Sequence, residues 1–173
     1  MAKRENARFE ELVLPHMGAG YNLARWMLGD ADRAEDALQD AAVKAFRSLS
    51  TVRGGEIKPW FLAIVRNTCL NALRAAKGRR AFEMEFADAD PDRAAVALGT
   101  SDVVMESMTS DDIQRAIEAL PAPLREVVIL RELEDLSYRE IAAAIGIPEG
   151  TVMSRLARAR ERLASALSCG GTA

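Results

Sequence analysis

Hydroxyl and guanidinium side chains recur at helical spacing near the C-terminal end of the chain. The apolar residues of this segment predict the inward stripe of a helix, and they are Val152, Leu156, Ala159 and Leu163. The opposite face is predicted to carry four polar side chains, Thr151, Ser154, Arg155 and Arg158. Groups of these types bond base edges and phosphates in the major groove of DNA. The pattern therefore favours a DNA-binding helix over an arginine-rich helix that serves only solubility.

The segment just before this helix has the signals of a tight helical turn. Ser137 with Glu140 three residues later forms the spacing of a capping box, which predicts the start of a short helix. Gly146 is placed to end that helix in a turn, and Pro148 with Glu149 is placed to start the next one. Two helices joined by a short glycine-containing turn are the signature of a helix-turn-helix.

A second group of side chains suits single-stranded nucleic acid. Residues 58–82 hold six basic and no acidic side chains, on a helix that we expect to begin at Pro59. Its polar face is predicted to carry Asn67, Asn71, Arg74 and Lys77, with Trp60 at its entrance. Basic groups can follow phosphates, and an aromatic ring can stack on an unpaired base. The alternative for Trp60 is a place in the hydrophobic core.

A third polar face is acidic. Asp32 with Glu35 predicts the start of a helix whose apolar stripe includes alanines and Phe46. The outer face of this helix is predicted to carry Asp36, Gln39 and Asp40. By its residue types alone this face is either a solvated helix surface or a docking surface for a protein partner.

The elements that must hold these faces are all helical. Apolar residues recur at three- and four-residue spacing, and no alternating run predicts a strand. The fold class is therefore all-α, and the 173 residues fit two small helical domains. We place these domains at residues 6–82 and 111–168. Between them, residues 83–110 have the composition of an acidic flexible linker.

The net charge of −3 conceals this uneven distribution. Residues 83–112 hold nine acidic side chains and one basic side chain, whereas every charged side chain in residues 58–82 is basic. Electrostatic fields act over a Debye length of roughly 8–10 Å, so a basic segment can still attract nucleic acid in an acidic chain.

Composition also excludes several classes of protein. Two cysteines and one histidine predict neither a disulfide framework nor a metal site, and we expect no cofactor and no catalysis. The charged start at Lys3 and Arg4 leads into no apolar segment, so we expect no secretory signal. No apolar run approaches the ~20 residues that cross a bilayer, so we expect no membrane insertion.

Two sets of motifs, in order along the chain, resemble the first and last conserved domains of bacterial sigma factors. The first set comprises DRAEDALQDAAVKAF at residues 32–46 and PWFLAIVRN at residues 59–67. The second comprises LPAPLREVVIL at 120–130, LSYREIA at 136–142 and GTVMSRLARAR at 150–160. A chain with only these two domains and a short linker is similar to the extracytoplasmic-function (ECF) group of the sigma-70 superfamily.

The resemblance implies a role for each of the three faces. Asp36, Gln39 and Asp40 would dock on the clamp helices of the largest subunit of core RNA polymerase. The basic face with Trp60, Asn67, Asn71, Arg74 and Lys77 would bind the melted minus-ten element of a promoter. Thr151, Ser154, Arg155 and Arg158 would read the duplex minus-thirty-five element. The resemblance further implies a bacterial cytoplasmic protein that binds promoter DNA, core RNA polymerase and an anti-sigma factor.

Two other classes of protein are compatible with parts of the pattern. A DNA-binding regulator with a sensory N-terminal module would carry a similar helix-turn-helix and would bind its duplex without polymerase. A small helical nucleotide hydrolase is the second alternative, but the sequence holds no glycine-rich phosphate loop.

Overall fold

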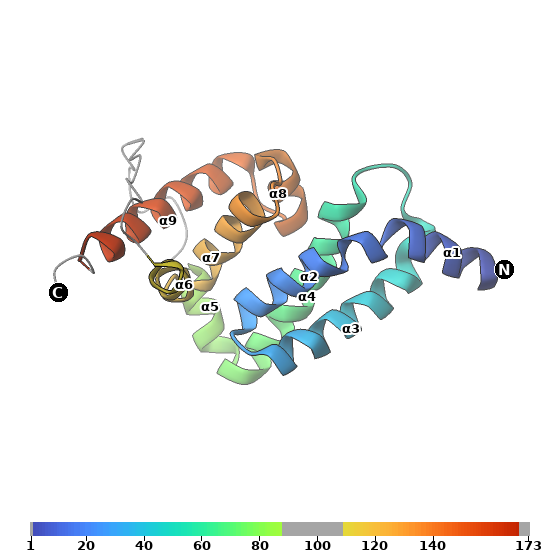
Figure 1. Ribbon diagram of the computed structural model, residues 1–173, viewed down its shortest axis with the longest axis horizontal. Coiled ribbons are helices and arrows are strands. Elements are labelled where there is room, and N and C mark those ends of the chain that lie inside the picture. The colour runs from blue at the N-terminus through green and yellow to red at the C-terminus, as the bar shows by residue number, and fades with distance from the viewer. Residues whose placement is uncertain (1, 88–108, 170–173) are drawn as a thin grey trace.

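The chain folds into helices that form two groups packed side by side (Figure 1). The structure is a computed structural model that describes residues 2–87 and 109–169. The first group contains α1 (Ala2–Leu12), η1 (Leu14–His16), α2 (Met17–Leu28), α3 (Ala31–Ser48), η2 (Leu49–Thr51), α4 (Ile57–Lys77) and α5 (Arg79–Ala87). The second contains α6 (Ser110–Glu118), α7 (Ala122–Val128), the π-helical turn η4 (Ile129–Leu133), α8 (Tyr138–Ile145) and α9 (Glu149–Cys169). The described ranges contain no strand, so the prediction of an all-α fold is confirmed.

In the first group, α2, α3 and α4 pack against one another around a common core. Phe61, Leu62 and Val65 of α4 are fully buried there, opposite the alanine stripe of α3. Alanines at Ala34, Ala37, Ala41 and Ala45 let α3 approach its neighbours closely because they carry no side chain beyond Cβ. This packing turns the polar side of α3 to solvent.

Gly20 shows how closely these three helices approach. A Cβ at Gly20 would lie 2.9 Å from Leu38 Cδ1 and 2.9 Å from Phe61 Cε1. We expect Gly20→Ala to lower the free energy of unfolding by about 1–3 kcal/mol, because the extra methyl group overfills the core. Urea unfolding followed by circular dichroism measures this change.

Gly18, in the same helix, is the matched control. A Cβ at Gly18 would meet no atom within 4 Å. Gly18→Ala should therefore raise stability by up to about 1 kcal/mol through helix propensity alone. Equal effects of the two substitutions would contradict the close packing at Gly20.

Two predicted helix starts in the first group are wrong by two residues. The N-cap of α3 is Asp30, whose Oδ1 accepts a hydrogen bond from the Arg33 N–H at 2.8 Å, whereas we predicted Asp32. Gly29 ends α2 in the left-handed conformation, and the extended backbone of Asp30 then suits a cap. Helix α4 starts at Ile57 after an extended Glu56, so Pro59 lies at its third position.

The predicted linker, residues 83–110, is helical at its start, because α5 continues to Ala87. Phe82 and Phe86 stack in this helix with ring centroids 4.6 Å apart. Helix α6 begins at Ser110, capped by the Thr109 side chain. The acidic residues Asp88, Asp90 and Asp92 lie outside the described residues.

The second group contains the predicted helix-turn-helix, formed by α8 and α9. The Ser137 hydroxyl accepts from the Glu140 N–H at 3.2 Å, and the Glu140 carboxylate accepts from the Ser137 N–H at 2.7 Å. The predicted capping box is therefore confirmed. Gly146 follows α8 with a φ of 73°, the left-handed conformation that glycine adopts at low cost. This turn sets the angle at which α9 leaves α8.

We expect Ser137→Ala to lower the free energy of unfolding by about 1 kcal/mol, because the first turn of α8 loses its cap. Urea unfolding measures the loss, and Ser165→Ala on the exposed side of α9 is the matched control. An equal loss in both variants would show that the capping box contributes nothing specific.

The stability that the capping box contributes should depend on pH. The backbone hydrogen bond from Ser137, followed by the bond with its hydroxyl, holds the pKa of Glu140 below its usual 4.5. The carboxylate therefore stabilises the fold fully above pH 4.5, and this contribution is lost as the pH falls through the lowered pKa. The difference between the wild-type chain and Ser137→Ala should shrink over that acid range.

Candidate nucleic-acid and polymerase interfaces

Helix α9 presents most of its predicted DNA-binding residues on the side away from its core contacts. Val152, Leu156 and Ala159 are buried. Thr151, Ser154 and Arg158 are half-buried at the edge of the accessible face, and the Ser154 hydroxyl donates to the Gly150 carbonyl at 2.8 Å. Arg158 also makes an interaction within the chain.

Arg155 does not lie on that face, so the prediction of its outward orientation is wrong. It is 8% exposed, and its Nη1 lies 3.5 Å from Oε1 of the buried Glu126. The physical reason is its register, since Arg155 falls three residues after Val152 and four before Ala159. Positions with that spacing share one helical face. Arg155 therefore lies at the margin of the apolar stripe, with Glu126 as its counter-ion.

The predicted face for melted DNA lies along α4. Asn67 and Asn71 are exposed on this helix, and each amide oxygen accepts from a neighbouring arginine, Arg66 and Arg74 respectively, at 3.5 Å. The guanidinium of Arg74 lies 4.8 Å from the centre of the Phe82 ring. Helix α4 thus brings the two amides and Arg74 onto one accessible side.

The two ends of this face differ from its middle. Lys77 forms an ion pair with Glu85 of α5 at 2.8 Å, so part of its charge is already compensated. Trp60 is half-buried and packs against the hydrophobic core. The Trp60 ring therefore lies partly in the core and partly at the surface, so both alternatives, core residue and base-stacking residue, remain open.

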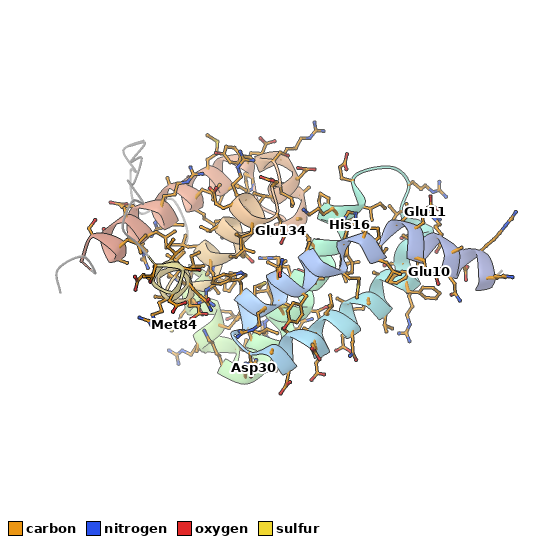
Figure 2. All side chains as sticks on the ribbon, in the orientation of Figure 1. Glu10, Glu11, His16, Asp30, Met84 and Glu134 are labelled. Carbon is orange, nitrogen blue, oxygen red and sulfur yellow. The ribbon has the colours of Figure 1, made fainter. Side chains whose placement is uncertain are left out.

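The acidic face of α3 is exposed to solvent. Asp36, Gln39 and Asp40 are all exposed, on the side opposite the buried alanine stripe. Two carboxylates and an amide on a rigid helix can bind a basic protein surface. Asp30, labelled in Figure 2, marks the start of this helix beside the end of α2.

The cysteine Cys69 and the histidine His16 both have shifted pKa values. Burial raises the pKa of the Cys69 thiol to about 12, so it carries almost no thiolate at neutral pH. Burial and the nearby Lys58 charge lower the pKa of His16. Within residues 2–87 and 109–169, no cluster of three His, Cys, Asp or Glu side chains could hold a metal ion. None of the helices in those ranges is long and apolar enough to cross a membrane.

Charged residues that are buried or half-buried join the two groups of helices, and the sequence did not predict these contacts. Arg66 of α4 donates to Glu126 of α7 through Nε at 2.7 Å and Nη2 at 3.0 Å. Lys58 donates to the Glu134 carbonyl at 2.7 Å and also pairs with its carboxylate at 3.3 Å. Figure 2 shows Glu134 at the boundary between the two groups. The sequence signal was Glu126, an acidic residue that follows Arg125 in the otherwise uncharged segment 120–130.

Comparison with known proteins gives matches to both groups of helices. The family model described as Sigma-70 region 2 matches residues 12–79, and the model described as Sigma-70, region 4 matches residues 110–163. The first match begins at the last residue of α1 and covers α2, α3 and α4, and the second covers α6–α8 and most of α9.

Curated relatives extend these matches along the chain. This chain is 36% identical to the RNA polymerase sigma-H factor of Pseudomonas aeruginosa, and the match covers 92% of this chain and 86% of that one. It is 38% identical to the ECF RNA polymerase sigma-E factor of Escherichia coli, over 74% and 70%. It is 35% identical to the ECF RNA polymerase sigma factor SigE of Mycolicibacterium smegmatis, and there the match spans 90% of this chain but only 60% of the relative.

Solved structures give the same picture of the fold. The sigma factor RpoE of Bartonella quintana, in complex with the anti-sigma factor NepR, superimposes with a TM-score of 0.70 and 30% identity, covering 93% of this chain and 97% of that one. CnrH, in complex with the cytosolic domain of CnrY, superimposes with a TM-score of 0.65 and 25% identity, covering 96% and 91%.

Proposed function

Because the chain belongs to the ECF RNA polymerase sigma factors, we propose that it binds core RNA polymerase and directs it to specific promoters. In this proposal the chain performs no catalysis and supplies only recognition. It acts in the cytoplasm, where polymerase and promoter DNA meet. The single observation that carries the proposal is the capped helix-turn-helix, which buries Val152 and Leu156 and keeps Thr151 and Ser154 accessible.

The upstream contact is assigned to α9. Thr151, Ser154 and Arg158 would contact the duplex minus-thirty-five element, with Arg155 holding the helix in place through Glu126. The start of α9, where Glu149 and Gly150 are exposed, would add backbone N–H donors for a phosphate. Phosphate contacts would fix the register, and base contacts would select the sequence.

The downstream contact is assigned to α4. Asn67, Asn71 and Arg74 would bind the melted minus-ten element together with Trp60 and Lys77. Amide groups can hydrogen-bond the edges of unpaired bases, and cations compensate the phosphates. Lys77 would have to exchange its Glu85 partner for a phosphate, so we expect it to contribute less than Arg74.

Polymerase docking is assigned to α3. Asp36, Gln39 and Asp40 would contact the clamp helices of the largest polymerase subunit. An anti-sigma factor is a further proposed partner, supported by the complex of the similar RpoE with NepR. Such a partner would compete for these surfaces.

Run-off transcription with purified core polymerase on a randomised promoter library tests the proposal. We expect transcripts only when the chain is present, from templates that share two separated sequence elements. The rival, a regulator that binds duplex DNA alone, predicts a sequence-specific gel shift without polymerase and no transcripts that depend on the chain. That result would replace the proposed function.

A further inference from the structure

Within its described residues, α9 exposes one large apolar side chain, that of Met153. Met153 is 47% exposed, whereas Val152 and Leu156 of the inward stripe are 0% and 1% exposed. Leu163, further along the helix, packs against the hydrophobic core. Single exposed apolar residues are common on protein surfaces, so exposure alone assigns Met153 no role. Its place in the helix-turn-helix does.

The residues that surround Met153 on the outward face of α9 are all small. This face is formed by residues at three- and four-residue spacing, which are Gly150, Met153, Ser154 and Ala157. Gly150 is exposed, and a Cβ at this position would meet no atom within 4 Å. The protein therefore leaves the space beside Met153 open. A ligand that approaches this face can contact the methionine side chain closely.

The position of Met153 along α9 is one that DNA covers. In helix-turn-helix proteins the N-terminal residues of the second helix contact base edges in the major groove. Helix α9 begins at Glu149, so Met153 lies in its second turn, next to Ser154 in the sequence. A duplex that contacts Ser154 in the proposed manner therefore also covers Met153.

A methionine side chain distinguishes thymine from the other bases by its apolar character. It has no hydrogen-bond donor, and its sulfur is only a weak acceptor. In the major groove guanine, adenine and cytosine present hydrogen-bonding groups, whereas thymine also presents its C5-methyl group. Covering a polar group with methionine leaves that group unpaired, which costs free energy. Covering the methyl group instead removes two apolar surfaces from water.

We propose that Met153 is a specificity-determining residue that selects a thymine in the minus-thirty-five element by contact with the C5-methyl group. This assignment rests on the proposed function and adds a base preference to it. Thr151, Ser154 and Arg158 supply polar contacts on the same helix, and Met153 supplies the apolar one.

Run-off transcription on the randomised promoter library gives the first test. Met153→Ala should lose the preference for thymine at one position of the upstream element and keep the preferences at the other positions. Alanine favours the helix at an exposed site, so this variant should keep its circular dichroism. Met84→Ala is the matched control, because Met84 is 61% exposed but lies on α5. Its base preferences should equal those of the unaltered chain.

The second test removes the methyl group from the DNA instead of the protein. Uracil replaces thymine at the position found in the library, and it differs from thymine only by lacking the C5-methyl group. The unaltered chain should transcribe the uracil template about fourfold less, the effect of one buried methyl group. Met153→Ala should transcribe both templates equally. Met153→Leu keeps an apolar side chain of similar volume, so it should retain the discrimination.

The two tests separate failure of the thymine contact from failure of the proposed function. Transcripts without a thymine preference, or discrimination against uracil that persists in Met153→Ala, would overturn the role of Met153 and leave the proposed function intact. If no template gives transcripts that depend on the chain, the proposed function fails, and a gel shift without polymerase decides the role of Met153. A uracil duplex that binds about fourfold more weakly would then support the contact. Equal binding of both duplexes, or binding of neither, would refute it.

Discussion

Asp40→Arg will weaken association with core RNA polymerase by at least about 30-fold. Asp40 is exposed on the rigid helix α3, and its neighbours Asp36 and Gln39 extend the same acidic face. Placing a cation where an interface requires an anion costs about 2 kcal/mol or more, and 1.4 kcal/mol corresponds to tenfold in affinity. Fluorescence anisotropy with labelled chain and purified core enzyme measures the dissociation constant.

Glu10→Arg is the matched control for this prediction. Glu10 is equally exposed and undergoes the same charge reversal, but it lies on α1. Its affinity for polymerase should change by less than about threefold, within the usual small effect of surface charges. Both variants should keep the circular dichroism of the original chain. Unchanged affinity in Asp40→Arg would remove α3 as the docking surface.

The helix-turn-helix could be predicted from the sequence because all of its signals are local. Ser137 and Glu140 lie three residues apart, and Gly146 is the residue that must adopt a positive φ. Each signal depends only on neighbouring backbone groups, and each is satisfied in the fold. The start of α3 was harder, because Asp30 and Asp32 are both good N-caps. Only the backbone conformation after Gly29 distinguishes them.

The contact between the two groups could not be predicted in this way. Arg66 and Glu126 are 60 positions apart, and no local pattern pairs them. A buried charge requires a partner, and by sequence the adjacent Arg125 could supply one to Glu126. Periodicity could not show that two arginines share it. The outward assignment of Arg155 failed for the same reason, because its residue type favoured the surface and its register favoured the interior.

Arg155→Ala and Arg158→Ala will therefore have different effects, although the two residues lie three positions apart on α9. Arg158→Ala should lower promoter-dependent transcription roughly 5- to 150-fold, the equivalent of about 1–3 kcal/mol for one lost base contact. Its free energy of unfolding should change by about 1 kcal/mol or less. Arg155→Ala should instead destabilise the chain by about 3 kcal/mol. This is the lower end for a broken buried ion pair, because Arg66 still neutralises Glu126.

Urea unfolding and run-off transcription on the same preparations separate these roles, at a temperature where circular dichroism shows both variants folded. Arg155→Lys is the control for Arg155, because lysine keeps the charge near Glu126 but lacks the planar fork of arginine. It should recover part of the lost stability. If Arg155→Ala keeps full stability and still loses transcription, Arg155 contacts DNA directly and its ion pair with Glu126 does not stabilise the fold. If Arg158→Ala transcribes normally, the base-reading face of α9 must lie elsewhere on the helix.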